Sequence, residues 1–211
     1  MKKILTFSII SAFIAFSSIS CKKDAAKTII NDTTGNVTTP KVKKYDVKSG
    51  IVTYNQHQEK GYGVDDTKIV VYFDNYGIIE SKEEYVNDVL KKRVYTNSDY
   101  VYDVSYSDKS VTKSLQKYAH YTTGVAEYYS NTVQQTILSD TTIAGKTCKY
   151  SSAKLTDLST KQAGYSGILF YYFEKITDVP AKTTTVTKYE EGVAMPASAF
   201  TYPSEFTVTE I

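Results

Sequence analysis

The chain has 211 residues, of which 41% are hydrophobic, and it carries 25 basic and 23 acidic side chains. This length suits one domain with a real hydrophobic core, and the near-balance of charge gives no reason to expect a nucleic-acid partner. Twenty tyrosines without a tryptophan, together with many Thr and Val residues, favour a strand-rich antiparallel protein.

Residues 1–20 have the pattern of a secretory signal that ends at a lipidated cysteine. Lys2 and Lys3 precede an apolar run over 4–16, and small residues then lead into Cys21. The run is shorter than the about 20 residues that cross a bilayer, so we expect a cleaved signal. Cleavage would leave Cys21 as the lipidated N-terminus of an anchored lipoprotein, although Ser18 stands where such signals usually carry Leu. The alternative is an ordinary signal that is cut elsewhere.

The segment after the signal is predicted to be a tether, because residues 22–44 are polar and lack any sustained period. Without Lys2 and Lys3 the chain would carry 23 basic and 23 acidic side chains. Residues 22–24 (Lys-Lys-Asp) partly match a signal for export to the cell surface, so the periplasmic and surface orientations both stay open. The expected organisation is a signal peptide at 1–20, lipidated cysteine and tether at 21–44, and one β-rich domain at 45–211.

The first half of this domain alternates apolar and polar residues, which predicts strands. The expected strands are Ile51–Asn55, Lys68–Phe73, a run from Ile78 towards Tyr85, Lys91–Tyr95 and Asp99–Tyr106. Clusters of Gly, Asp and Asn predict turns at 61–66 and 74–77. The alternation places Ile69, Val71 and Phe73 on one face of their strand.

The middle of the chain breaks this alternation, and we expect one or two helices within 114–138. After it come a turn at 144–146, strand Thr147–Tyr150, a polar loop, the apolar strand Ile168–Phe173, strand Thr183–Tyr189, a loop over Met195–Phe200 and a last strand Phe206–Ile211. Regular hairpins with few helices predict a mainly β (α+β) fold. We expect a curved antiparallel sheet or half-barrel that wraps around one or two helices.

No catalytic or metal-binding motif stands out in the sequence: it has no glycine-rich phosphate loop, HExxH helix or GxSxG elbow. We therefore expect no enzyme, cofactor or metal. Cys148 would be the one cysteine left once Cys21 carries lipid, and an unpaired cysteine is usually buried and inert. A nucleophilic Cys148 would need a histidine, but His57 and His120 lie in no recognisable motif. Acidic pairs such as Glu83-Glu84 are read as solvated strand ends.

Five short segments carry a family resemblance: SGIVTY at 49–54, YFDNYG at 72–77, TIAGKTCKY at 142–150, GI at 167–168 and MPASAFTYP at 195–203. On these segments the chain resembles a group of uncharacterised Bacteroidota lipoproteins, which is similar to the outer-membrane lipoprotein-sorting (LolA/LolB-like) superfamily. The resemblance implies a half-barrel whose apolar concave face binds acyl chains or another lipophilic ligand. It makes Ile168, Phe170 and Tyr172 ligand-binding candidates as sheet-lining positions, and it leaves the ligand's identity open.

Two functions follow from this reading. The first is a non-enzymatic, lipid-anchored outer-membrane protein, on the periplasmic or cell-surface side, that binds a lipophilic ligand or a lipidated partner. The alternative is a surface interaction module whose tyrosine-rich sheet, including Tyr100 and Tyr102, contacts protein or glycan. A hydrolase ranks third. We expect a monomer that is held at the membrane through Cys21 and has no nucleic-acid partner.

Overall fold

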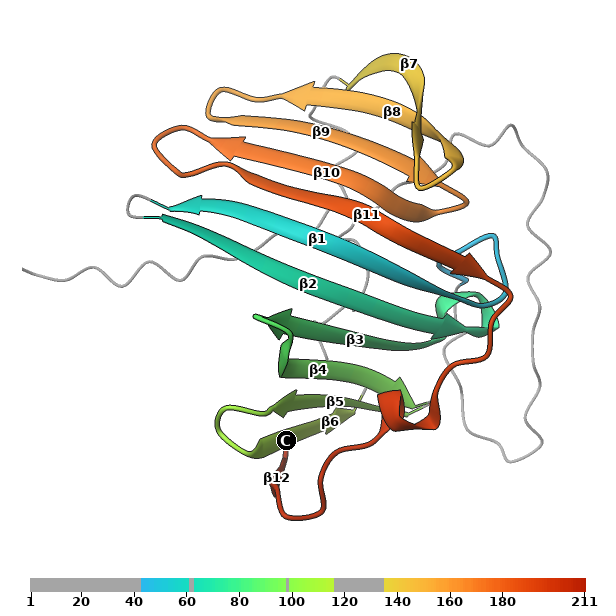
Figure 1. Ribbon diagram of the computed structural model, residues 1–211, viewed down its shortest axis with the longest axis vertical. Helices are drawn as coiled ribbons and strands as arrows, with labels where there is room; N and C mark the ends of the chain where they lie inside the picture. Colours follow the sequence, from blue (N-terminus) through green and yellow to red (C-terminus); the bar gives the residue numbers. More distant parts are fainter. Residues whose placement is uncertain (1–42, 61–62, 98, 116–134) are drawn as a thin grey trace, which may run out of the picture.

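The computed structural model describes residues 43–60, 63–97, 99–115 and 135–211, and these residues form one open twelve-stranded sheet (Figure 1). The strands are β1 (Gly50–Lys60), β2 (Gly63–Asp74), β3 (Ile79–Val86), β4 (Val89–Asn97), β5 (Tyr100–Ser105), β6 (Ser110–Leu115), β7 (Gln135–Ile143), β8 (Lys146–Lys154), β9 (Leu158–Tyr165), β10 (Ile168–Ile176), β11 (Lys182–Glu191) and β12 (Thr207–Glu210). Two short 3-10 helices, η1 (Asn75–Gly77) and η2 (Ala197–Phe200), interrupt them.

The strand order is β12-β6-β5-β4-β3-β2-β1-β11-β10-β9-β8-β7. Two series of consecutive antiparallel hairpins, β1 to β6 and β7 to β11, meet where β1 pairs with β11. The first described strand therefore lies in the middle of the sheet, and long-range pairing joins the two halves. At one edge β12 runs parallel to β6, which departs from the expected all-antiparallel sheet.

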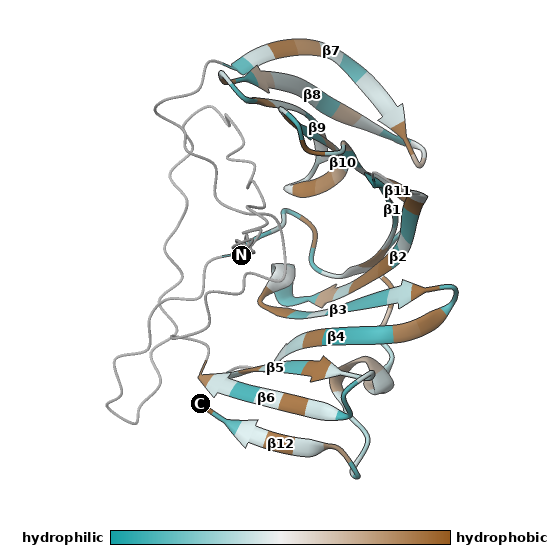
Figure 2. Cartoon of the chain, turned by 90° about the vertical axis from the view of Figure 1, so that its left-hand side faces the viewer, coloured by the Kyte–Doolittle hydropathy of each residue, from teal (hydrophilic) through white to brown (hydrophobic). Residues whose placement is uncertain are grey.

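The sheet bends, and its two faces carry different residues. Figure 2 shows the bend from the side; we call the concave side the inner face and the convex side the outer face. On β1 the inner face carries Val52, Tyr54 and Gln56, whose register partners on β2 are Val71, Ile69 and Thr67. Because alternate residues of a strand point to opposite faces, the register extends this assignment from strand to strand.

A short segment before β1 packs on the inner face, and we call residues 43–49 the strap. Its Tyr45 ring lies edge-on to Phe73 of β2, with 4.6 Å between ring centroids. Its backbone bonds the turns of two hairpins, since Tyr45 N donates to the carbonyl oxygen of Tyr76 and Asp46 N to that of Ser166. The strap thereby ties the β2–β3 turn to the β9–β10 turn across the centre of the sheet.

The outer face has a second, smaller core over β4, β5 and β6. Tyr95, Val104 and Val111 are buried there together with Phe206 of the C-terminal segment. Phe200 of η2 packs on Tyr95 with 6.1 Å between ring centroids. The strap and the C-terminal segment thus cover opposite faces of the same sheet.

Several sequence predictions are confirmed. Each expected strand falls within or overlaps an observed one, and the turns at 74–77 and 144–146 lie between strands or at a strand start. Ile69, Val71 and Phe73 are buried on one face of β2, as the alternation predicted.

Among the described residues, which exclude the predicted signal at 1–20, there is no helix long and apolar enough to span a membrane.

Other predictions were wrong or lie outside the described residues. A polar loop was expected after Tyr150, but part of that segment forms β9. Its polar residues Thr160 and Gln162 are buried on the sheet, whereas the prediction took such residues to be solvated. Asp65 and Asp66 extend β2 instead of forming a turn. Glu83 is buried within β3 and paired with Arg93, so it is not the solvated strand end that was expected. The ends of the expected helical segment, 114–115 and 135–138, are strand, and its remainder, 116–134, is not described. Among the described residues there is no α-helix, so a sheet that wraps around helices is not supported.

Candidate ligand-binding face of the sheet

The centre of the inner face is apolar. It is built from buried side chains of the four central strands β2, β1, β11 and β10, namely Ile69, Val71, Phe73, Val52, Tyr54, Val186 and Phe170. Each large apolar side chain that leaves water in this way stabilises the fold by about 1.5–3 kcal/mol. These side chains are at most 9% exposed, and Tyr45 of the strap packs in the same cluster. We call this continuous buried patch across the strands the apolar surface.

All three candidates from the sequence lie on β10 and are buried. Ile168 and Phe170 belong to the central core, where the Phe170 ring packs edge-on against Tyr189 with 5.3 Å between centroids. Tyr172 lies farther along the strand, and its hydroxyl donates to Glu174 Oε2 at 2.6 Å. Burial, followed by this carboxylate, raises the pKa of Tyr172 far above its usual range. Contact of these residues with a ligand stays a prediction.

The strap closes one end of the apolar surface with a buried carboxylate. Glu80 of β3 is fully buried, and its Oε2 accepts from the Tyr45 hydroxyl at 3.1 Å and from Lys44 Nζ at 3.2 Å. Burial and the nearby Glu80 carboxylate raise the pKa of Tyr45 well above its usual range. These bonds fix the strap on the sheet, so this end of the inner face is occupied by the chain itself.

The other side of the apolar surface is bordered by a row of polar residues that share one register line. Ser151 pairs with Gln162, Gln162 with Tyr172, Tyr172 with Thr184, and Thr184 with Gln56. We call these five residues the polar row. The sequence analysis missed Ser151 and Gln162 because it predicted a loop over residues 151–163. In the structure both residues lie on strands and are buried on the inner face.

The next register line carries opposite charges. Glu174 of β10 is the direct partner of Lys182 of β11. Desolvation lowers the pKa of Lys182, while the Glu174 carboxylate opposes that shift. Along the central strands the inner face therefore changes from apolar, through neutral polar, to a balanced charged pair.

The described residues place two of the remaining titratable candidates, Cys148 and His57, in different surroundings. Cys148 is fully buried, and its thiol donates to the carbonyl oxygen of Lys146 at 3.5 Å. Burial raises the pKa of Cys148, which disfavours the thiolate that nucleophilic attack needs. His57 is partly exposed and lies 2.9 Å from Asp66, Nδ1 to Oδ1. His120 and Cys21 are outside the described residues.

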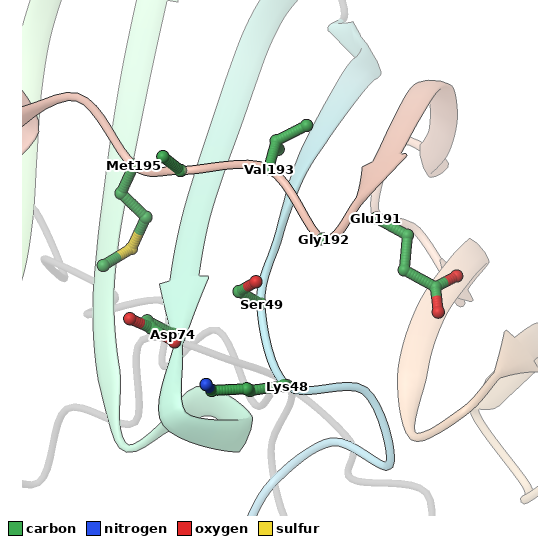
Figure 3. Close-up of a pocket in the computed structure, with 8 residues that line it drawn as sticks. Lys48, Ser49, Asp74, Glu191, Gly192, Val193 and Met195 are labelled. Carbon is green, nitrogen blue, oxygen red and sulfur yellow. The ribbon is translucent and has the colours of Figure 1, made fainter.

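Within the described ranges, no group of three His, Cys, Asp or Glu residues is placed to hold a metal ion. A pocket of about 460 Å³ lies where residues 192–195 cross the sheet beside β1 and β2 (Figure 3). Its lining comprises Lys48, Ser49, Asp74, Glu191, Gly192, Val193, Ala194 and Met195. None of these residues belongs to the polar row, and charged and apolar groups are mixed, so we do not assign the ligand site to this pocket.

Comparison with known proteins gives a fold but no family. Neither protein-family models nor curated proteins match this chain. Among solved structures, an uncharacterized conserved protein from Thermus thermophilus has 9% sequence identity and a TM-score of 0.54, over 81% of this chain and 95% of that one.

Two other structural neighbours are a LolA superfamily protein and a putative lipoprotein-sorting domain. A LolA superfamily protein from Nitrosomonas europaea has 7% identity and a TM-score of 0.39, over 75% of this chain and 94% of that one. A putative outer membrane lipoprotein-sorting protein domain from Vibrio parahaemolyticus has 9% identity and a TM-score of 0.35, over 72% and 89%. Of these three likenesses, the Thermus one supports the open curved sheet as a known fold, and the other two are too distant to carry an argument.

Proposed function

We propose that this protein is a non-enzymatic envelope lipoprotein that binds a lipophilic ligand, or the lipid of a lipidated partner, on the inner face of its sheet. The observation that carries the proposal is the apolar surface across β2, β1, β11 and β10, which is buried in the ligand-free chain and lies on the concave side of an open sheet. An open sheet can admit an elongated ligand from its edge, and its bend gives such a ligand contact along one side. Lipophilic ligands bind where a concave apolar surface removes them from water.

Two features of the sequence support the same proposal. The resemblance to lipoprotein-sorting proteins implies acyl-chain binding on the concave face. The signal that ends at Cys21 would place the domain beside a membrane, on a tether of about 23 residues that reaches roughly 25–30 Å. A Cys21→Ala variant should lose palmitate labelling and leave the membrane fraction; continued labelling would contradict the anchor.

The ligand proposal is tested on residues 22–211, which include every described strand. Native mass spectra before and after organic extraction would reveal a co-purified lipid, and a fluorescent fatty acid would report uptake. We expect a ligand-bound mass or saturable uptake. A clean apoprotein mass without uptake of the probe would contradict the proposal.

A matched pair of variants separates the two faces. Ile69 points to the inner face and is buried, whereas its neighbour Val70 points to the outer face and is half-buried. Ile69→Thr should weaken uptake of the probe, because it places a hydroxyl in the apolar surface. Val70→Thr, which makes a similar change on the same strand, should leave uptake unchanged. Thermal melts of both variants would show that each is folded at the assay temperature.

The alternative function, a tyrosine-rich interaction surface, has less support from the structure. Tyr102 stacks on Tyr95 at 4.6 Å between centroids and lies 6.1 Å from Tyr202 of the C-terminal segment. Tyr100 packs under Lys113, whose Nζ is 4.0 Å from the ring centroid. These rings pack against other parts of the outer face, which leaves less of them free for a partner. The interaction-surface alternative would be favoured if a Tyr100→Ala variant lost binding to a protein or glycan.

A further inference from the structure

We infer that the polar row binds the head of the ligand, and that this head is neutral and rich in hydroxyl and ester groups, as in an acylglycerol. The inference rests on the proposed function and deepens it, because it assigns the orientation and the chemical class of the lipid. The acyl chain would lie on the apolar surface, and the head would lie over β8 to β11.

The first observation is a set of buried oxygens without partners. Ser151, Gln162 and Thr184 are only 4%, 7% and 7% exposed. Ser151 Oγ, Gln162 Oε1 and Thr184 Oγ1 have no hydrogen-bond partner among the described residues. A buried polar atom that lacks a partner destabilises the fold, and native proteins contain few of them. Three such oxygens in one register line therefore point to a polar partner that binds there.

The second observation is their spacing. Neighbouring strands lie about 4.8 Å apart, so the row from Ser151 to Thr184 spans three strand intervals, roughly 14 Å. That length exceeds a single hydroxyl or carboxyl group and suits a head with several polar atoms. Two hydroxyls and an amide both donate and accept, which suits alcohol and ester oxygens.

The third observation is the charge around the row. The adjoining line pairs Glu174 with Lys182, so its charges are balanced. Tyr172, inside the row, already donates to Glu174. The row itself contributes no charged side chain, and the charges of Glu174 and Lys182 beside it offset each other. The row therefore offers no net counter-charge to an ionised head, which is why we assign an acylglycerol rather than a fatty acid or phospholipid.

The test uses residues 22–211 and two probes. Diphenylhexatriene is a hydrocarbon that fluoresces when it leaves water, so its binding reports the apolar surface alone. Below its micellar range, 1-monopalmitoylglycerol competes with it and adds a neutral head. The variants Ser151→Ala, Gln162→Met and Thr184→Val each remove a polar group of the row and keep similar side-chain volume.

We expect each variant to weaken 1-monopalmitoylglycerol binding by about 3- to 10-fold, the effect of one lost hydrogen bond. Diphenylhexatriene binding should stay within about twofold. The control variants Ser152→Ala and Thr185→Val change the next residue of the same strands, on the opposite face, and should alter neither affinity.

Stability supplies an independent readout. Because each variant removes an unpaired buried oxygen, the ligand-free Thr184→Val and Ser151→Ala chains should melt at the wild-type temperature or above it. A lower melting temperature would mean that these oxygens have partners in the ligand-free protein, and it would overturn the inference.

The remaining outcomes are also decisive. Unchanged 1-monopalmitoylglycerol affinity in all three variants, with diphenylhexatriene still bound, would overturn the polar row as a head site and leave the apolar surface in place. That result would indicate that water pairs with the row. Failure of the wild-type chain to bind either probe would overturn both the head site and the proposed function.

Discussion

Loss of the Arg93 side chain should expose how the outer face holds the C-terminal segment. The guanidinium Nε donates to Glu83 Oε1 at 2.9 Å, and Nη2 donates to the same oxygen. Nη1 donates to the carbonyl oxygen of Thr201 at 2.6 Å, so one side chain links β3, β4 and the segment after η2. The second oxygen of Glu83 accepts from the hydroxyls of Tyr72 and Tyr85.

The expected cost follows from burial. The Arg93 and Glu83 side chains are 9% and 4% exposed, so solvent screens their interaction weakly. Arg93→Met leaves the Glu83 carboxylate buried with two tyrosine donors and no cation. Breaking a buried ion pair from one side costs about 3–5 kcal/mol, a large part of the about 5–15 kcal/mol by which domains are stable.

Urea denaturation followed by circular dichroism measures this cost on residues 22–211. The midpoint should fall for Arg93→Met, and the slope of free energy against urea should stay constant. The double variant Glu83→Leu/Arg93→Met removes both charges and should recover at least half of the lost stability, because apolar residues replace buried ion pairs well. A loss below about 1 kcal/mol for Arg93→Met, or a double variant no better than the single one, would refute this reasoning.

Three further predictions concern other parts of the fold. Gly77→Ala should lower the urea midpoint by more than Gly145→Ala does. Both glycines have positive φ, +81° and +75°, so the backbone strain of an alanine is similar. A Cβ at Gly77 would lie 2.7 Å from the Tyr45 ring, whereas a Cβ at Gly145 would meet nothing within 4 Å. Equal losses would contradict the strap contact. Burial, then a nearby carboxylate, raises the pKa of Tyr72 from 10.0 to about 12. Its contribution is therefore intact below pH 10 and lost between pH 10 and about 12, as the unfolded chain ionises first; melts across this range should fall less steeply in Tyr72→Phe. Cys148 should react with a thiol reagent only in urea, since it is buried with a raised pKa; rapid reaction of the native chain would disprove this.

Local pattern was informative wherever a strand has one apolar face. In β2 the alternation of Ile69, Val71 and Phe73 predicts both the strand and its buried side. The Asp74–Gly77 turn was equally readable, because Gly77 takes the positive φ that favours glycine. These signals depend only on neighbours in the chain.

β9 was hidden because its inward residues are polar. Thr160 and Gln162 are buried on the sheet, yet a buried polar residue and a solvated loop residue look alike in a sequence. The candidate site was affected in the same way. Phe170 and Tyr172 became candidates through the family resemblance and the apolar run at 168–173. Gln162 and Thr184 were not singled out before the register aligned them.

The sequence by itself determined the strand-rich class, the position of many hairpins and which side chains of each strand share a face, since a period of two is a local property of the backbone. Only the tertiary structure decided that β1 pairs with β11, that β12 runs parallel to β6, and that the strap and the C-terminal segment cover opposite faces. The physical reason is that strand pairing and packing join residues far apart in the chain, so the same alternation fits many neighbours. The polar row, for example, forms only when β8, β9, β10, β11 and β1 pair in this order and register.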